Sequence, residues 1–190
     1  VQNVDRLFFS HGGIMRGEFD ELYNALFSNA ELYISVVKAL AQHHDGMTRT
    51  EISKVIGANG GTLTRVLTNL ERCDFISRSQ NFGCKTKDTI YRLMDFYTLF
   101  YYKFIAQDTS GDEQWWSHNF ESRLVSTWQG LTFEIVCLMH TDCIKKALGI
   151  SGMATEVSSW RKVADDKQRG GQIDLVIKRA DRIVHLCEMK

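Results

Sequence analysis

The sequence predicts a chain of mixed helices and strands, of the α+β or α/β class, that folds as two small domains. Apolar side chains recur at helical spacing through the first seventy or so residues. Two later stretches, 75–93 and 173–189, each hold a pair of strand-like runs separated by a polar turn. With 44% hydrophobic residues over 190 positions, the chain has enough apolar material for two cores, so a disordered chain is not expected.

The composition narrows the classes of partner and compartment. Lys plus Arg and Asp plus Glu both total 23, so a nucleic-acid surface has to be local rather than spread over the whole chain. The five cysteines include no C-x-x-C pair, and no secretory leader precedes them, which favours a reduced, cytoplasmic protein. No apolar run approaches the roughly 20 residues that span a bilayer, so no membrane partner is expected.

Three consecutive helices are expected in the first half, after a shorter helix over Phe19–Phe27. The first runs from Glu31 to about His44, the second begins at a capping box formed by Thr48 and Glu51, and the third begins at Thr62 after a glycine-rich interruption. This is the spacing of a helix-turn-helix. The side chains expected to be buried on the second and third helices are Ile52, Val55, Ile56, Leu63, Val66, Leu67 and Leu70.

A β-hairpin is expected to follow the third helix. Phe75–Arg78 forms one strand, Asn81–Lys87 a polar turn, and Thr89–Leu93 the returning strand. The hairpin is in the position of a wing, and an aromatic helix over Asp95–Ile105 follows it. The sequence therefore predicts a winged helix-turn-helix domain over residues 30–106, preceded by a linker helix within residues 1–29.

The polar face of the third helix is the candidate nucleic-acid surface, because in such a module this face enters the major groove. Residues 47–92 contain eight basic and four acidic side chains, and this local excess suits phosphate contacts. Double-stranded DNA is therefore an expected partner, although winged helices also serve as protein-protein or intradomain modules. The candidate contact residues are Thr62, Thr64, Arg65, Thr68, Asn69 and Arg72 on the helix, with Arg78, Lys85, Lys87 and Arg92 on the wing.

A second domain is expected over residues 107–190. The polar run Gln107–Gln114 is the expected linker, and one or two helices follow between Phe120 and Leu148. Strands over Ile173–Ile177 and Ile183–Met189 then form a hairpin. The second of these strands is almost continuously apolar, which is typical of a central strand.

Two carboxylates and a lysine are expected to converge on this hairpin. Side chains alternate along a strand, so Glu188 and Lys190 point the same way, and the hairpin can bring Asp174 beside them. Paired carboxylates suit Mg²⁺ or Mn²⁺, and the lysine could orient an attacking water, with Glu134 from the preceding helix completing the metal shell. The four residues are thus candidate catalytic groups, and Asp174, Glu188 and Glu134 candidate metal ligands. The alternative is a salt bridge of Lys190 with Asp174 or Glu188.

The whole chain resembles the C-terminal region of archaeal-type AAA/STAND-like ATPases. The resemblance rests on Gly60–Thr64, Phe75–Ile76, Lys85–Asp88, Tyr91–Asp95, Trp128–Gly130, Phe133–Glu134, Leu148–Ile150, Gln172–Leu175 and Cys187–Lys190. The resemblance implies that residues 1–29 end the lid of an ATPase domain, and that this absent N-terminal domain binds ATP and is a partner of the chain. It also implies that residues 107–190 form a restriction-endonuclease-like, or PD-(D/E)xK, domain that is incomplete at its C-terminus. In that family Glu134, Asp174, Glu188 and Lys190 match the helix glutamate, the strand aspartate and the ExK motif.

Two functions remain open on this basis, and whether the chain is an enzyme stays undecided. The first is a DNA-associated effector that hydrolyses phosphodiesters with a bound magnesium ion. The alternative is a non-catalytic winged-helix module, binding DNA or protein, of an ATP-binding regulator. Metal binding at Asp174 and Glu188 separates the two. A third possibility, packing of the winged helix against the ATPase alone, predicts no affinity for DNA.

Overall fold

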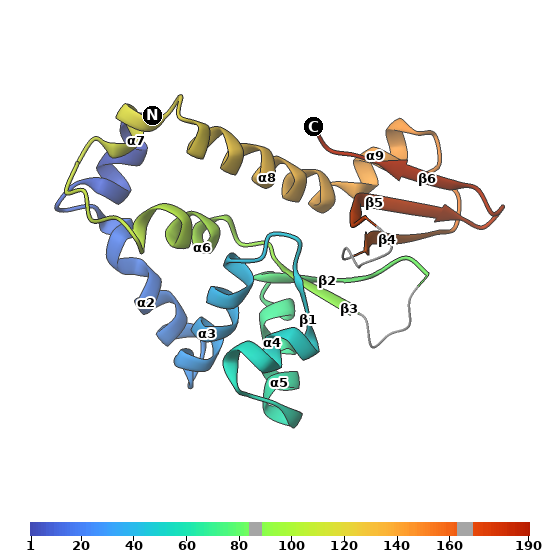
Figure 1. Ribbon diagram of the computed structural model, residues 1–190, viewed down its shortest axis with the longest axis horizontal. Helices are drawn as coiled ribbons and strands as arrows, with labels where there is room; N and C mark the ends of the chain where they lie inside the picture. Colours follow the sequence, from blue (N-terminus) through green and yellow to red (C-terminus); the bar gives the residue numbers. More distant parts are fainter. Residues whose placement is uncertain (84–88, 163–168) are drawn as a thin grey trace. The chain divides into compact units, whose positions relative to one another are not determined.

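The structure, a computed structural model, describes residues 1–83, 89–162 and 169–190, and it contains two compact units. Unit 1 comprises Val1–Ser77 and Tyr91–Trp128, and unit 2 comprises Arg78–Ile90 and Gln129–Lys190. Unit 1 begins with the helical segments α1 (Gln2–Val4), η1 (Asp5–Phe9) and α2 (Ile14–Leu26) (Figure 1). In the described residues no helix is both long and apolar enough to cross a membrane.

The helix-turn-helix consists of α3 (Ala30–Ala41), α4 (Arg49–Ile56) and α5 (Gly60–Arg72), with the short strand β1 (Met47–Thr48) before α4. The predicted capping box is confirmed: the amide of Glu51 donates to Oγ1 of Thr48 over 3.3 Å, and the amide of Thr48 donates to Oε2 of Glu51 over 2.7 Å. Gly57 ends α4 with φ of 69°, a left-handed conformation that favours glycine. Helix α4 is therefore fixed at both of its ends.

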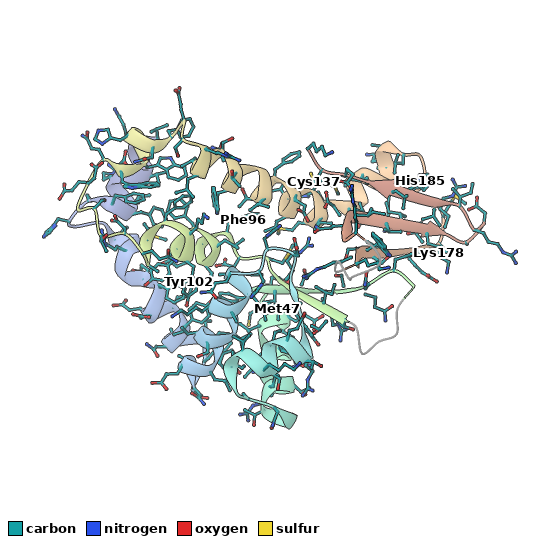
Figure 2. The ribbon with its side chains drawn as sticks, viewed as in Figure 1. Met47, Phe96, Tyr102, Cys137, Lys178 and His185 are labelled. Carbon is teal, nitrogen blue, oxygen red and sulfur yellow. The ribbon has the colours of Figure 1, made fainter. Side chains whose placement is uncertain are left out.

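One hydrophobic cluster holds these helices together. Its centre is formed by Leu63, Val66, Leu67 and Leu70 of α5, all at most 2% exposed, together with side chains of α2, α3 and the wing. Met47 of β1 joins them at 4% exposure (Figure 2). One expectation was wrong: Val55 is 60% exposed, because α4 is short and turns only Ile52 fully inward.

The wing is formed by β2 (Ile76–Gln80) and β3 (Thr89–Leu93), and the sheet order is β1-β3-β2. The returning strand has the bounds that the sequence predicts. Ile76 and Leu93 are both 2% exposed and anchor the base of the wing in the core. The predicted turn residues Lys85 and Lys87 lie outside the described residues.

A second aromatic cluster completes unit 1. It unites η1 with α6 (Phe96–Phe100), η3 (Tyr101–Ile105), α7 (Trp115–Asn119) and the start of α8 (Arg123–Met139). Phe104 and Trp116 are both buried in it, so the polar segment 107–114 connects two parts of one core. Asp5, which is 6% exposed, caps α7 by accepting the amide of Trp116 over 2.8 Å. The domain bounds expected from the sequence remain a prediction.

Unit 2 contains a three-stranded antiparallel sheet in the order β4 (Thr155–Lys162), β5 (Gly171–Arg179) and β6 (Val184–Cys187). The end of α8 and α9 (Thr141–Ala147) lie beside this sheet (Figure 1). Leu175, Ile177 and Ile150 form a small core there, against which Leu138 of α8 and Ile144 of α9 pack. Across the strands, Lys178 pairs with Glu156 over 2.9 Å (Figure 2). The predicted hairpin is present, and the strand β4 was not foreseen.

The predicted central position of the last strand was wrong. In the described part of the chain β5 is the central strand and β6 lies at an edge, where Leu186 is 63% exposed and Val184 40% exposed. The near-continuous apolar pattern of 183–189 thus does not reflect burial on both faces.

We expect Thr48→Ala to lower the free energy of unfolding by about 1 kcal/mol, because the first turn of α4 loses its side-chain acceptor. Urea denaturation measures the change. Thr50→Ala, an exposed substitution in the same turn, is the control and should alter stability by less than about 0.5 kcal/mol. Equal effects of the two substitutions would show that the capping box does not stabilise the domain.

Candidate nucleic-acid interface

The polar face of α5 follows from the burial of its opposite face. Thr62, Arg65, Asn69 and Arg72 succeed one another at intervals of three or four residues, so they form one stripe along the helix. Thr62, Arg65 and Arg72 are exposed, whereas Asn69 and the neighbouring Thr68 are half-buried. The structure therefore places four of the six predicted helix contacts on one stripe, and three of these four are exposed.

Arg49 ties the start of α4 to the start of α5. Its Nη2 donates to the carbonyl oxygen of Gly60 over 2.8 Å and to Oγ1 of Thr64 over 3.1 Å. Thr64 in turn donates its hydroxyl to the carbonyl of Gly60 over 3.2 Å. The predicted contact residue Thr64 is thus engaged within the protein. In the sequence Arg49 is one of eight basic residues between positions 47 and 92, and no spacing reveals that its side chain reaches across the turn.

Asn69 is also held by the protein. Its Nδ2 donates to the hydroxyl oxygen of Tyr33 on α3 over 2.8 Å. The ring of Tyr33 is stacked on Phe27, with 3.9 Å between ring centroids and 7° between ring planes. Tyr33 and Phe27 are 6% and 7% exposed, so this contact is anchored in the core of unit 1.

The N-terminus of α5 is open to solvent. Asn59 provides no side-chain cap, and a Cβ added to Gly60 or Gly61 would meet no atom within 4 Å. The first-turn amides of a helix carry partial positive charge and suit a phosphate oxygen. This end of α5 therefore complements the two exposed arginines on the stripe.

The two predicted wing residues that the structure describes differ in exposure. Arg78 is exposed, but Arg92 is 8% exposed and is a poor candidate for phosphate contact because strand β3 turns it inward. Lys85 and Lys87 remain predictions, outside the described residues. Arg65 and Arg72 of α5, together with Arg78, are therefore the exposed cations among the predicted contacts that the structure describes.

The end of β2 leads into unit 2, where residues 81 and 82 hydrogen bond to β4. The side chain of Asn81 makes two bonds with Arg161: Nδ2 donates to its carbonyl oxygen over 3.0 Å, and Oδ1 accepts its amide proton over 2.8 Å. The amide of Phe82 donates to the carbonyl of Ser159 over 2.7 Å. Ser159 is in a β-bulge, where the β4–β5 register shifts, and a bulged residue has backbone groups left over from the ladder.

Among the candidate metal-site residues, Asp174 is 9% exposed in the central strand β5. Its Oδ2 accepts the amide proton of Met189 over 3.0 Å, and its Oδ1 accepts from Nε2 of Gln172 over 3.2 Å. Leu175 pairs with Cys187, and this register continued by one residue places Glu188 opposite Asp174. Glu188 is itself exposed.

The place of Glu134 in a metal site stays a prediction. This residue is half-buried on α8, and within the described residues no group of three His, Cys, Asp or Glu side chains is arranged to hold a metal ion. Lys190 is exposed, and no salt bridge to Asp174 or Glu188 is formed in the described part of the chain. The strand register thus places two of the predicted ligands, Asp174 and Glu188, opposite each other.

We expect Asn81→Ala to speed amide hydrogen exchange at Phe82 and Arg161 roughly tenfold, because the two side-chain bonds that hold this segment on β4 are lost. Hydrogen-exchange mass spectrometry or NMR checks the change. Gln80→Ala, at an exposed neighbouring position, is the matched control. Unchanged protection in the Asn81 variant would show that these bonds do not hold the segment.

Comparison with known proteins bears on the helix-turn-helix and the wing. A solved structure of a point mutant of S. aureus MepR is 19% identical and covers 74% of this chain and 95% of its own, but its TM-score of 0.31 is too low to support a structural argument. No curated protein matches the chain. Residues 35–82, which contain α4, α5 and most of α3 and reach into the wing, match the MarR family. Residues 35–82, the helix-turn-helix with the first strand of the wing, are thus similar to the MarR family.

Proposed function

We propose that this chain is a non-catalytic regulatory module that binds double-stranded DNA through the exposed face of α5. The observation that carries the proposal is the stripe of Thr62, Arg65 and Arg72, which is accessible while the opposite face of the helix is buried. An α-helix fits the major groove of B-form DNA, and arginine is the side chain that most often contacts its bases. The MarR family match over residues 35–82 supports the same function.

The charge distribution also supports a duplex as the partner. Residues 47–92 have twice as many basic as acidic side chains, although the whole chain has zero net charge. Arg65 makes no hydrogen bond or ion pair with any of the residues described, so binding a duplex breaks no existing contact of its guanidinium group. If the winged helix only packed against protein, these charged arginines would be removed from water at the contact. That desolvation costs free energy unless the partner supplies acidic side chains.

We expect Arg65→Ala to weaken duplex binding about tenfold or more, and we expect the affinity of the wild-type chain to fall as salt is added. Fluorescence anisotropy with a labelled duplex at several salt concentrations measures both effects. Arg6→Ala removes an exposed arginine from η1 and is the matched control, expected to leave affinity unchanged. Undetectable binding by the wild-type chain at low salt would refute the proposal.

A second candidate function is divalent-cation binding by Asp174 and Glu188, as in a restriction-endonuclease-like domain. One observation favours it: a carboxylate is buried in the middle of a three-stranded sheet, a position that is rarely occupied by an acidic residue without a partner. Oxygen ligands suit Mg²⁺ and Mn²⁺. However, the hydrogen bonds from Met189 and Gln172 already satisfy part of this carboxylate, and no group of three His, Cys, Asp or Glu side chains in the described residues is arranged to hold a metal ion.

If this second function holds, Glu188→Gln abolishes Mn²⁺ binding while the fold is retained, because the substitution removes one of two anionic ligands. Titration of Mn²⁺ followed by electron paramagnetic resonance measures binding, and circular dichroism checks the fold. Glu121→Gln, an exposed substitution between α7 and α8, controls for nonspecific cation binding. The same Mn²⁺ affinity in both variants would exclude the Asp174–Glu188 site, and with it the resemblance to a nuclease would lose its chemical basis.

A further inference from the structure

We propose that Asn69 is a positioning residue that Tyr33 holds in place, and that base recognition by α5 therefore falls to Arg65, which favours guanine. The inference rests on the proposed binding of double-stranded DNA and specifies how the same surface reads its target. It divides the residues of one helical stripe into those that contact DNA and those that set the position of the helix.

The position of Asn69 on the helix makes it an apparent base reader. It lies between Arg65 and Arg72 on the exposed stripe, and an asparagine in the major groove commonly forms two hydrogen bonds with adenine. That recognition needs both the amide nitrogen and the amide oxygen of the side chain. In this structure one of the two N–H groups of the amide donates to the hydroxyl of Tyr33, which fixes the orientation of the amide, and the side chain is half-buried.

Breaking the hydrogen bond between Asn69 and Tyr33 would cost free energy, because Tyr33 is held in the core. The Tyr33 hydroxyl belongs to a ring that is 6% exposed and stacked on Phe27, so the ring cannot follow the amide outward. If Asn69 turned toward a base, this hydroxyl would lose the partner that the structure gives it in a partly buried site. The contact therefore joins α5 to α3 near the middle of the recognition surface and adds to the packing that sets the rotation of α5.

Thr64, nearer the start of the helix, is also held by hydrogen bonds, to Arg49 and to the carbonyl of Gly60. Two of the polar groups on α5 are thus held by contacts within unit 1. Arg65 is the long, exposed side chain that remains near the centre of the stripe, and its guanidinium group matches the two acceptors that guanine presents in the major groove. The expected target is a duplex with guanine at the position facing Arg65.

The test is a double-mutant cycle with Tyr33→Phe and Asn69→Ala, measured against a set of duplexes that differ by single base pairs. Tyr33→Phe keeps the stacked ring and removes only the hydroxyl. We expect each single variant to bind every duplex about threefold to tenfold more weakly, with the same order of base preference and the same dependence on salt. The double variant should bind no more weakly than whichever single variant binds more weakly, because both substitutions break the same Asn69–Tyr33 hydrogen bond. Arg65→Ala should instead reduce the preference for guanine.

Tyr101→Phe is the matched control. Its ring is stacked on Phe19 with 4.0 Å between centroids and 3° between planes, which resembles the Tyr33–Phe27 pair, but its hydroxyl makes no hydrogen bond with the residues described. This variant should bind DNA as the wild type does. Amide exchange without DNA provides a second measurement: exchange over the second half of α5 should rise in the Tyr33 and Asn69 variants and not in the Tyr101 variant.

The outcomes separate this inference from the function on which it rests. If the wild-type chain binds no duplex, the proposed function and this inference both fail. If the wild type binds but Asn69→Ala alters which base is preferred, or if the two substitutions act additively, Asn69 reads DNA and only this inference fails. A uniform loss of affinity, with coupling between Tyr33 and Asn69, supports it.

Discussion

The burial of one face of α5 is the constraint on which the rest of the winged helix depends. Four aliphatic side chains of this helix enter the core, and each fully buried aliphatic side chain contributes about 1.5–3 kcal/mol. Because these side chains fix how α5 is rotated, they also decide which of its polar residues meet solvent. The short turn after Gly57 then sets the angle between α4 and α5, and Arg49 secures the turn from the outside. The DNA-facing surface is thus largely a consequence of packing.

The local features of the helix-turn-helix could be predicted because each depends on neighbours in sequence. The Thr48–Glu51 capping box, the buried positions of α5 and the bounds of β3 are all short-range patterns. Val55 shows the limit of such patterns, since an apolar residue on a two-turn helix can face solvent when the helix has only one packed side. The contacts from Arg49 to Gly60 and from Asn69 to Tyr33 cross between helices, and no local pattern encodes them.

Much of unit 2 could not be predicted, because its arrangement also depends on contacts between residues that are far apart in the sequence. Its hairpin is local and was foreseen, but β4 carries polar and charged residues at many positions and pairs with β5 through a bulge, so it lacks a clean alternating pattern. The position of β6 at an edge is decided by which strands are present beside it, not by its own apolar content. The candidate carboxylates illustrate a related limit: strand register placed Glu188 opposite Asp174, whereas nothing in the sequence determined how far Glu134 lies from them.

The bonds from Asn81 and Phe82 to β4 have a consequence for how the protein avoids self-association. An uncovered strand at the edge of a sheet presents unpaired amides and carbonyls to any other extended chain, and proteins commonly cover such edges. Here the chain's own residues occupy the outer side of β4 at its bulge, where Ser159 and Arg161 would otherwise offer backbone groups to a neighbour. The segment that leads out of the wing therefore also protects this part of the β4 edge from unwanted strand addition.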